Sequence, residues 1–172
     1  MRGSEREAEF VDFVRAHRSD LVRTAVLLCA GDEAYAEDLV QTTLTKLYLA
    51  WGKVRRADRP LAYARTSLTN TFFDERRRAH RRRETSTAED WALDTPVRDE
   101  DRSLRQVVLA ALGQLGPRQR AVVVLRHWHD LDVEETAKIL GCSEGTVKSQ
   151  NARALAHLRS VLGPELVLAG EA

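Results

Sequence analysis

Apolar residues recur at helical spacing along most of the chain and divide it into segments. In the first segment, apolar positions three or four residues apart predict a helix near residues 5–29. They are Phe10, Phe13, Val14, Leu21, Ala25 and Leu28. Gly31 and Asp32 end this helix. A second helix is predicted near residues 33–51, and its apolar side is formed by Leu39, Val40, Leu44 and Leu47.

A basic loop and a third helix complete the first predicted domain. Residues 52–59 are polar and mostly basic, which predicts a loop. Pro60 suits the first turn of a helix, because its missing N–H would have no partner there. The helix that follows has an apolar side and runs into the basic residues 76–78. Three such helices can close a small bundle, so we place the first domain at residues 1–79.

The second half of the sequence has its own helical pattern. Residues 80–101 lack apolar periodicity, which predicts a flexible acidic linker. An apolar stripe from Leu104 to Leu115, a break at Gly116 and Pro117, and a continuation over 122–128 predict two helices. A short helix over 133–140, a turn at 141–143 and a longer helix over 144–161 follow. The sequence therefore predicts an all-α protein of two small helical domains, the second at residues 102–172.

The net charge of +1 hides an uneven distribution. Residues 51–83 contain eleven lysines and arginines against three carboxylates, whereas residues 84–101 contain seven carboxylates and one arginine. A concentrated basic segment indicates a site for a polyanion, with nucleic acid as the leading candidate. Charge alone leaves open the alternative of a solvated charged face. Neither a signal peptide nor a long apolar run is visible, so we expect a cytoplasmic protein without membrane association.

Residues 133–159 have the pattern of a helix-turn-helix. Ala137 supplies a small side chain where two helices cross, Gly141 allows a tight turn, and Ser143 is placed to cap the second helix. The early residues of such a helix contact base edges in the major groove, and amide or basic side chains suit that task. We therefore predict DNA contacts for Thr146, Lys148, Ser149, Gln150 and Arg153. A plain helical hairpin is the alternative.

Together these motifs resemble the extracytoplasmic-function (ECF) group of bacterial sigma factors, in the sigma-70 family. Region 4 of that family, which binds the −35 promoter element and the polymerase β flap, is similar to LGPRQRAVVVLRHWHDLDVEETAKILGCSEGTVKSQNARALAHLR. Region 2.2 is similar to YAEDLVQTTLTKLY, and regions 2.3 and 2.4 are similar to RPLAYARTSLTNTFFDERRR. The resemblance covers about Phe10 to Leu162, and the segment SQNARAL is similar to the actinobacterial sigma-E-type subgroup.

The resemblance implies a factor that binds core RNA polymerase and directs promoter-specific initiation. Glu37, Asp38 and Gln41 would contact the coiled coil of the polymerase β′ subunit. A polar, acidic helix face is chemically suited to a basic partner, although an exposed charged face alone would not show it. Promoter DNA is a further implied partner, and so is an anti-sigma protein that sequesters the factor.

Contacts with the −10 element are implied for the basic segment. Residues 52–62 would form the loop that captures a flipped base, and Asn70 would lie beside that pocket, where its amide can donate and accept. A helix-surface amide is the alternative for Asn70. The basic −10 contacts implied are Arg59, Arg65, Arg76 and Arg77.

The sequence departs from the family at several of these positions. Thr42 stands where many members have glutamate, and Gln150 where many have arginine. Some members have an aromatic residue at the position of Ala152, and lysine at position 148 lacks the bidentate geometry of arginine. A known −35 sequence therefore cannot be carried over to this chain.

Two alternative functions are an enzyme or metal site and a regulator that does not join polymerase. His127, His129 and Cys142 match no zinc spacing, and no phosphate loop or nucleophile motif is present, so we expect no enzyme, cofactor or metal site. Cys29 and Cys142 are expected to be buried thiols. A helix-turn-helix regulator that does not join polymerase remains an alternative, but its partner domain would be α/β.

Overall fold

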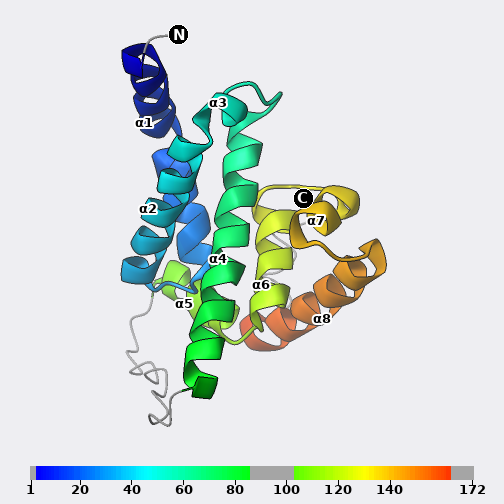
Figure 1. Ribbon diagram of the computed structural model, residues 1–172. Helices are drawn as coiled ribbons and strands as arrows, with labels where there is room; N and C mark the ends of the chain where they lie inside the picture. Colours follow the sequence, from blue (N-terminus) through cyan, green and yellow to red (C-terminus); the bar gives the residue numbers. More distant parts are fainter. Residues whose placement is uncertain (1–2, 86–102, 164–172) are drawn as a thin grey trace.

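The computed structural model describes residues 3–85 and 103–163, here called the first and second halves, and both are built from helices. This confirms the predicted all-α class. The first half contains α1 (Gly3–Leu28), α2 (Glu33–Leu49), α3 (Trp51–Val54) and α4 (Pro60–Thr85). The second half contains α5 (Leu104–Gly113), α6 (Pro117–Val123), the π-helical segment η1 (Val124–Trp128), α7 (Val133–Leu140) and α8 (Glu144–Leu162). In Figure 1, α4 stands between the α1–α2 pair and helices α6 to α8.

The first half is a bundle of α1, α2 and α4 around an apolar core. Leu21, Leu39, Leu68 and Phe72 are fully buried in it, one or two from each helix. Each such side chain stabilises the fold by about 1.5–3 kcal/mol relative to exposure. Asp32 starts α2, because its carboxylate accepts a hydrogen bond from the backbone N–H of Tyr35 at 2.9 Å. Among the described helices, none combines the length and apolarity needed to cross a membrane.

The segment predicted as a loop at 52–59 begins with an extra helical turn, α3. Trp51 is 3% exposed and Val54 is fully buried, and their spacing of three residues places both on one side of a single turn. The Trp51 ring packs against Phe10 and Phe13, with ring centroids 5.2 and 5.1 Å apart. The burial of these two side chains thus stabilises a helical turn in a segment whose polar, basic composition favours a loop.

The third predicted helix, α4, extends beyond the predicted end of the first domain. α4 begins at Pro60 as predicted but continues past residue 79 to Thr85. In its last turns, His80 Nε2 lies 3.1 Å from Glu84 Oε1, at the spacing that brings side chains together on a helix. Residues 80–85 of the predicted linker are therefore helical, and residues 86–101 lie outside the described part of the chain.

The second half follows the predicted order of helices with one local departure. Gly116 and Pro117 separate α5 from α6 as expected. The continuation over 122–128 widens into η1, where His129 N–H donates to Val124 O at 3.1 Å instead of to the carbonyl four residues back. Helices α7 and α8 occupy the residues predicted for them within one position.

The two halves share one hydrophobic core. Leu109 of α5, Ala121 of α6 and Val124 of η1 belong to the same buried cluster as the core residues of α1, α2 and α4. The turn between α1 and α2 contacts α5 closely, because a Cβ on Gly31 would lie 3.3 Å from Leu109 Cδ1. The second half is therefore packed on the first.

A buried arginine joins the halves at this core. Arg120 is 8% exposed. Its guanidinium donates to Leu28 O at 2.8 Å, to Leu112 O at 2.9 Å and to Leu115 O at 3.0 Å. Leu28 is the last residue of α1, and Leu112 lies in the last turn of α5, so the cation sits where helix dipoles are negative. Burial lowers the pKa of Arg120, but these acceptors satisfy the charge.

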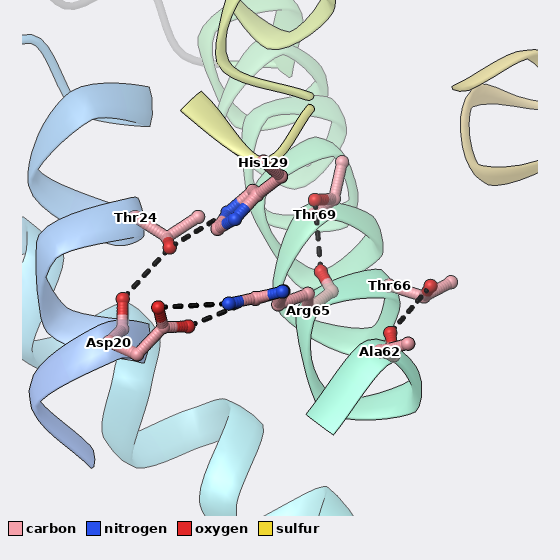
Figure 2. A network of polar contacts seen from close by, with 7 residues as sticks. All are labelled: Asp20, Thr24, Ala62, Arg65, Thr66, Thr69 and His129. Atoms are coloured by element: carbon pink, nitrogen blue, oxygen red, sulfur yellow. Dashed lines mark hydrogen bonds and ion pairs between the residues drawn. The ribbon is translucent and has the colours of Figure 1, made fainter. Parts of the chain in front are cut away.

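A polar network lies beside this core (Figure 2). Arg65 of α4 makes two hydrogen bonds of 3.0 Å to the carboxylate of Asp20 on α1. Thr24 donates its only hydroxyl hydrogen to Asp20 O at 2.8 Å. Its oxygen remains as an acceptor for His129 Nε2, 3.0 Å away, so the ring is the Nε2–H tautomer. His129 of the second half thus contacts Thr24 of α1 as a neutral imidazole.

Acidification is expected to loosen the packing of the two halves. Burial, and next the Arg65 charge, lower the pKa of His129 to about 4, while Asp20 opposes the shift. With the halves apart, its pKa would be about 6.5. The packed arrangement therefore keeps its full stability above about pH 6.5 and loses stability as the pH falls toward 4. We expect the radius of gyration from small-angle X-ray scattering to rise between about pH 7.5 and about pH 5.

Two glutamine variants separate His129 from other titrating groups. His129→Gln keeps an N–H donor for Thr24 but does not titrate, so this pH response should largely disappear. His127→Gln is the matched control, because His127 is exposed and contacts Asn151 of the same half at 3.0 Å. An unchanged response in His129→Gln would contradict the assignment.

Candidate nucleic-acid interface

Helices α7 and α8 and the turn between them form the predicted helix-turn-helix. A capping box starts α7: the Asp132 carboxylate accepts from Glu135 N–H at 2.7 Å, and the Glu135 carboxylate accepts from Asp132 N–H at 3.2 Å. Gly141 ends α7 in the left-handed region, with φ of 61°. Ser143 then caps α8, because its hydroxyl accepts from Thr146 N–H at 3.1 Å. The predicted roles of Gly141 and Ser143 are confirmed.

Small and apolar side chains hold the two helices together. Ala137 of α7 is 6% exposed, and it packs with Val147 of α8 and Val122 of α6, which are 0% and 1% exposed. The small side chain of Ala137 lets the helices approach closely, as predicted. The outer side of α8 is therefore fixed relative to the rest of the second half.

The predicted −35 contacts lie on the early part of α8. Lys148, Ser149 and Arg153 are exposed, whereas Thr146 and Gln150 are half-buried. The Thr146 hydroxyl lies 2.9 Å from that of Ser143, so it also belongs to the helix cap. Within residues 3–85 and 103–163, neither Lys148 nor Arg153 has an ion-pair partner. Their charges are available to an external anion.

The predicted −10 contacts of α4 are exposed on its second part. Asn70, Arg76 and Arg77 are all exposed. The Arg76 guanidinium lies 5.6 Å from the centroid of the Phe72 ring, and Arg77 pairs with Asp74 one turn away. This hydrogen bond from Arg77 is the main cause that lowers the pKa of Asp74. The second part of α4 therefore has exposed cations that are only partly neutralised by neighbouring carboxylates.

A cleft of about 1180 Å³ separates α4 from the second half. Asn70, Arg76 and Arg77 line one side of it, and Gln150 of α8 and Arg118 of α6 line the other. Residues predicted for the −10 and −35 elements thus meet in one basic cleft. Arg118 was not among the residues predicted from the sequence, although the two arginines of the segment GPRQR were a visible signal.

Two of the arginines predicted to contact the −10 element, Arg65 and Arg59, do not line this cleft. Arg65 is engaged with Asp20 in the network of Figure 2, and its side chain is 25% exposed. Its bidentate pair favours a structural role, because the guanidinium would have to leave a partly buried carboxylate to reach a phosphate. Arg59 lies in the loop before α4, is 78% exposed and reaches Glu135 of α7 at 3.8 Å. Such an exposed pair contributes about 0–1 kcal/mol and can readily break.

The predicted polymerase-binding residues lie on α2. Asp38 and Gln41 are exposed, while Glu37 is half-buried and pairs with Arg18 at 2.6 Å. The helical face of Asp38 and Gln41 continues to Tyr48 and Leu49, which are 43% and 75% exposed. Neither residue was predicted from the sequence, although both stand outside the apolar stripe of α2. This face, called the outer face of α2, combines polar and apolar groups.

The residues considered for a metal site have separate partners. His129 contacts Thr24, and His127 contacts Asn151. Cys29 is buried, and burial raises the pKa of its thiol to about 12, so it is a thiol rather than a thiolate. Cys142 is only half-buried. Its predicted burial is therefore incomplete.

Comparison with known proteins shows the family. Residues 13–82 match sigma-70 region 2, and residues 105–158 match sigma-70 region 4. An RNA polymerase sigma-E factor of Streptomyces coelicolor is 40% identical over 156 residues, which cover 90% of this chain and 86% of that protein. The ECF RNA polymerase sigma factor SigL of Mycobacterium tuberculosis is 35% identical over 150 residues, covering 85% of this chain and 84% of SigL.

A solved structure agrees with this relationship. The sigma factor RpoE in complex with the anti-sigma factor NepR, from Bartonella quintana, is 26% identical and has a TM-score of 0.72. The match covers 91% of this chain and 98% of RpoE. The chain therefore belongs to the sigma-70 family and to its ECF group. The resemblance inferred from the sequence motifs is confirmed.

The turn of the helix-turn-helix should depend on Gly141. Gly141→Ala would place a Cβ in the left-handed region, which costs about 1–2 kcal/mol. We expect the free energy of unfolding, measured by guanidinium titration with circular dichroism, to fall by that amount. Gly145→Ala is the control, because Gly145 is in the right-handed region and its Cβ would meet Ser143 Oγ at an ordinary 3.8 Å. Equal losses in both variants would contradict the role of the turn.

Proposed function

We propose that this chain binds core RNA polymerase and directs promoter-specific initiation, with one DNA-contacting face in each half. The proposal is supported by one observation: the exposed faces described above lie within the segments that match sigma-70 regions 2 and 4. The outer face of α2 and the exposed part of α4 lie within the region 2 match, and the helix-turn-helix lies within the region 4 match. The work is specific binding rather than catalysis, and it takes place in the cytoplasm, where core polymerase acts.

Polymerase binding is assigned to the outer face of α2. Asp38 and Gln41 offer a carboxylate and an amide to a basic, polar partner surface, which we take to be the β′ coiled coil. Tyr48 and Leu49 extend the face with apolar area, and aromatic groups are favoured at the centres of interfaces. Glu37 supports this face through its pair with Arg18. The second half would add a contact with the β flap.

Contact with the −10 element is assigned to α4 and the loop before it. The loop at residues 55–59 carries Arg59, whose side chain is 78% exposed. Asn70 supplies an amide that can pair with the edge of an unstacked base. Arg76 and Arg77 supply charge for the phosphates of a single strand. Arg65 holds α4 to α1 in this assignment and does not contact DNA.

Contact with the −35 element is assigned to α8. Gln150 can form a bidentate pair with adenine, and Arg153 can do so with guanine or bind a phosphate. Lys148 adds a phosphate contact. Thr146 and Ser149 are close enough to the helix start to approach base edges or phosphates. Because each half is a weak DNA binder alone, their linkage in one polymerase-bound chain raises the joint affinity.

An anti-sigma protein is proposed as a further partner. The support is the similar structure of RpoE, which was solved with an anti-sigma factor. Such a partner would control how much of the chain is available to polymerase.

The proposed function is tested by transcription in vitro with purified core polymerase and a promoter library. Initiation that requires the chain supports the proposal. Tight binding to DNA without polymerase, and no initiated transcript from any promoter, would favour a regulator that does not join polymerase.

Charge reversal on the outer face of α2 should weaken polymerase binding. Asp38→Lys places a cation against a basic surface, and we expect the Kd for core polymerase to rise at least about tenfold. Surface plasmon resonance measures it. Asp12→Lys is the control, because Asp12 lies on α1 with 77% side-chain exposure and makes the same change in charge. Similar losses in both variants would remove this assignment.

Loss of Arg153 should weaken promoter binding more than polymerase binding. For Arg153→Ala we expect a loss of about 1–3 kcal/mol in binding of the holoenzyme to a selected promoter, with little change in polymerase affinity. Arg15→Ala removes an equal charge from the exposed surface of α1 and serves as control. Filter binding at two salt concentrations checks the result, since a lost phosphate contact also reduces the salt dependence. An unchanged promoter affinity would contradict the role of Arg153.

A further inference from the structure

An apolar groove of about 630 Å³ lies between α1 and α5, with the end of η1 beside it, and none of its lining residues lines the basic cleft. Its apolar lining includes Val22, Val26, Leu27, Leu104, Val108 and Trp128. The rings of Trp128 are 51% exposed as part of that residue, and Leu104 is 62% exposed. Contiguous exposed apolar surface on a small protein marks a place where another segment binds.

The charged residues around the groove leave one cation without a partner. Arg105 pairs with Glu33 at 3.3 Å. Glu37 pairs with Arg18 at 2.6 Å. Arg23 is exposed and lines the groove, and it has no ion-pair partner among residues 3–85 and 103–163. An occupant with a carboxylate next to a few apolar side chains would therefore complement both the apolar lining and the free cation.

The chain leaves α8 at the edge of this groove. Leu162, the last residue of α8, packs on the buried cluster shared by α5 and α8, and so do Leu27 and Val108 of the groove lining. Gly163 ends the helix with φ of 83°, so the backbone turns away from the helix axis there. Pro164 follows and cannot continue the helix, because it has no N–H. The residues after Gly163 therefore start beside the groove.

The segment that follows α8 has the complementary composition. Residues 164–172 read PELVLAGEA, in which Glu165 directly precedes the apolar triplet 166–168. An extended chain covers about 3.3–3.6 Å per residue, so this triplet can reach as far as about 18 Å from Gly163. Arg23 precedes Leu27 by about one helical turn, which is only about 6 Å along α1. The apolar lining and the free cation are thus both within reach of the segment.

We propose that residues 164–168 bind in the groove between α1 and α5, with the triplet 166–168 against the apolar lining and the Glu165 carboxylate facing Arg23. Attachment to α8 makes the contact intramolecular, and a short tether gives an effective concentration of about millimolar. A contact too weak to form between separate molecules is therefore formed within one chain. Any other molecule that uses the groove must displace the segment, which lowers its apparent affinity. The inference does not depend on the proposed function.

Photo-crosslinking in the full chain locates the segment directly. With p-benzoylphenylalanine in place of Val167, we expect crosslinks within one molecule to the α1 and α5 residues of the groove lining, identified by mass spectrometry. The same group in place of Ala152, which is exposed earlier on α8, is the control and should not label the groove. Crosslinks from position 167 that fall outside the groove, or that join two molecules, would overturn the inference.

Acrylamide quenching of Trp128 fluorescence measures how well the segment covers the groove. Trp51→Phe and Trp91→Phe leave Trp128 as the only tryptophan of the chain. In that background, Leu166→Ser with Leu168→Ser makes the triplet polar. We expect the quenching constant to rise at least about twofold, because the apolar surface around Trp128 returns to water.

The matched control for quenching is Ala169→Ser with Ala172→Ser, which adds the same two hydroxyls outside the triplet and should leave the quenching constant unchanged. Equal constants in the triplet variant, the control and the parent would show that the segment does not cover the groove. Trp51 is buried, and its replacement can disturb the first half. The crosslinking experiment keeps all three tryptophans, so it decides the question if that background does not fold.

An exchange of charges tests the orientation of the segment. Glu165→Lys and Arg23→Glu each place like charges together, so each should raise the quenching of Trp128. The double variant restores a pair of opposite charges and should return the quenching toward the parent value. Glu171→Lys is the control for the change in net charge and should have little effect. A double variant that is quenched as strongly as the single variants would overturn the placement of Glu165 at Arg23.

Discussion

Arg120 brings a full positive charge into the place where the two halves share a core, and much of the arrangement follows from how that charge is satisfied. Its hydrogen bonds go to backbone carbonyls at the ends of α1 and α5. Such carbonyls are fixed in space by the helices that carry them, so the ends of α1 and α5 must lie together. The turn between α1 and α2, which packs against Leu109 of α5, has two residues in the left-handed region, Ala30 at φ 53° and Gly31 at φ 92°. A guanidinium without those acceptors would be costly to bury.

The same constraint decides which surfaces face outward. With α5 and α6 held at the end of α1, the second half lies along α4, and α8 comes to face the cleft. The outer face of α2 is left exposed. The outer face of α2 and the residues that line the cleft therefore differ in accessibility, although both belong to one small chain.

The features that the sequence predicted are those set by residues close together in the chain. The helix-turn-helix was predictable because Gly141, Ser143 and the spacing of apolar residues act locally. The pair of Arg65 with Asp20 could not be predicted from the basic segment, because the two residues are 45 positions apart in the chain. Residues 118 and 120 are both arginines in one short motif, yet Arg118 lines the cleft and Arg120 is buried where the two halves meet. α3 and η1 were missed for the same reason, since tertiary packing shapes both.

The charges in the cleft affect both the packing of the two halves and the proposed contact with DNA, because the same side chains are involved in each. Asp74 is the carboxylate that lines the cleft, and it is shared by Arg77 and by Lys46 at 3.7 Å. Among the described residues that line the cleft, this one carboxylate stands against Arg76, Arg77 and Arg118, so the described lining carries more positive than negative charge. Phosphates would satisfy these cations far better, because each arginine can form charge-assisted, bidentate bonds to them. The packed form is thus stabilised by the shared core and the hydrogen bonds of Arg120, and it is opposed by repulsion between the cations that line the cleft.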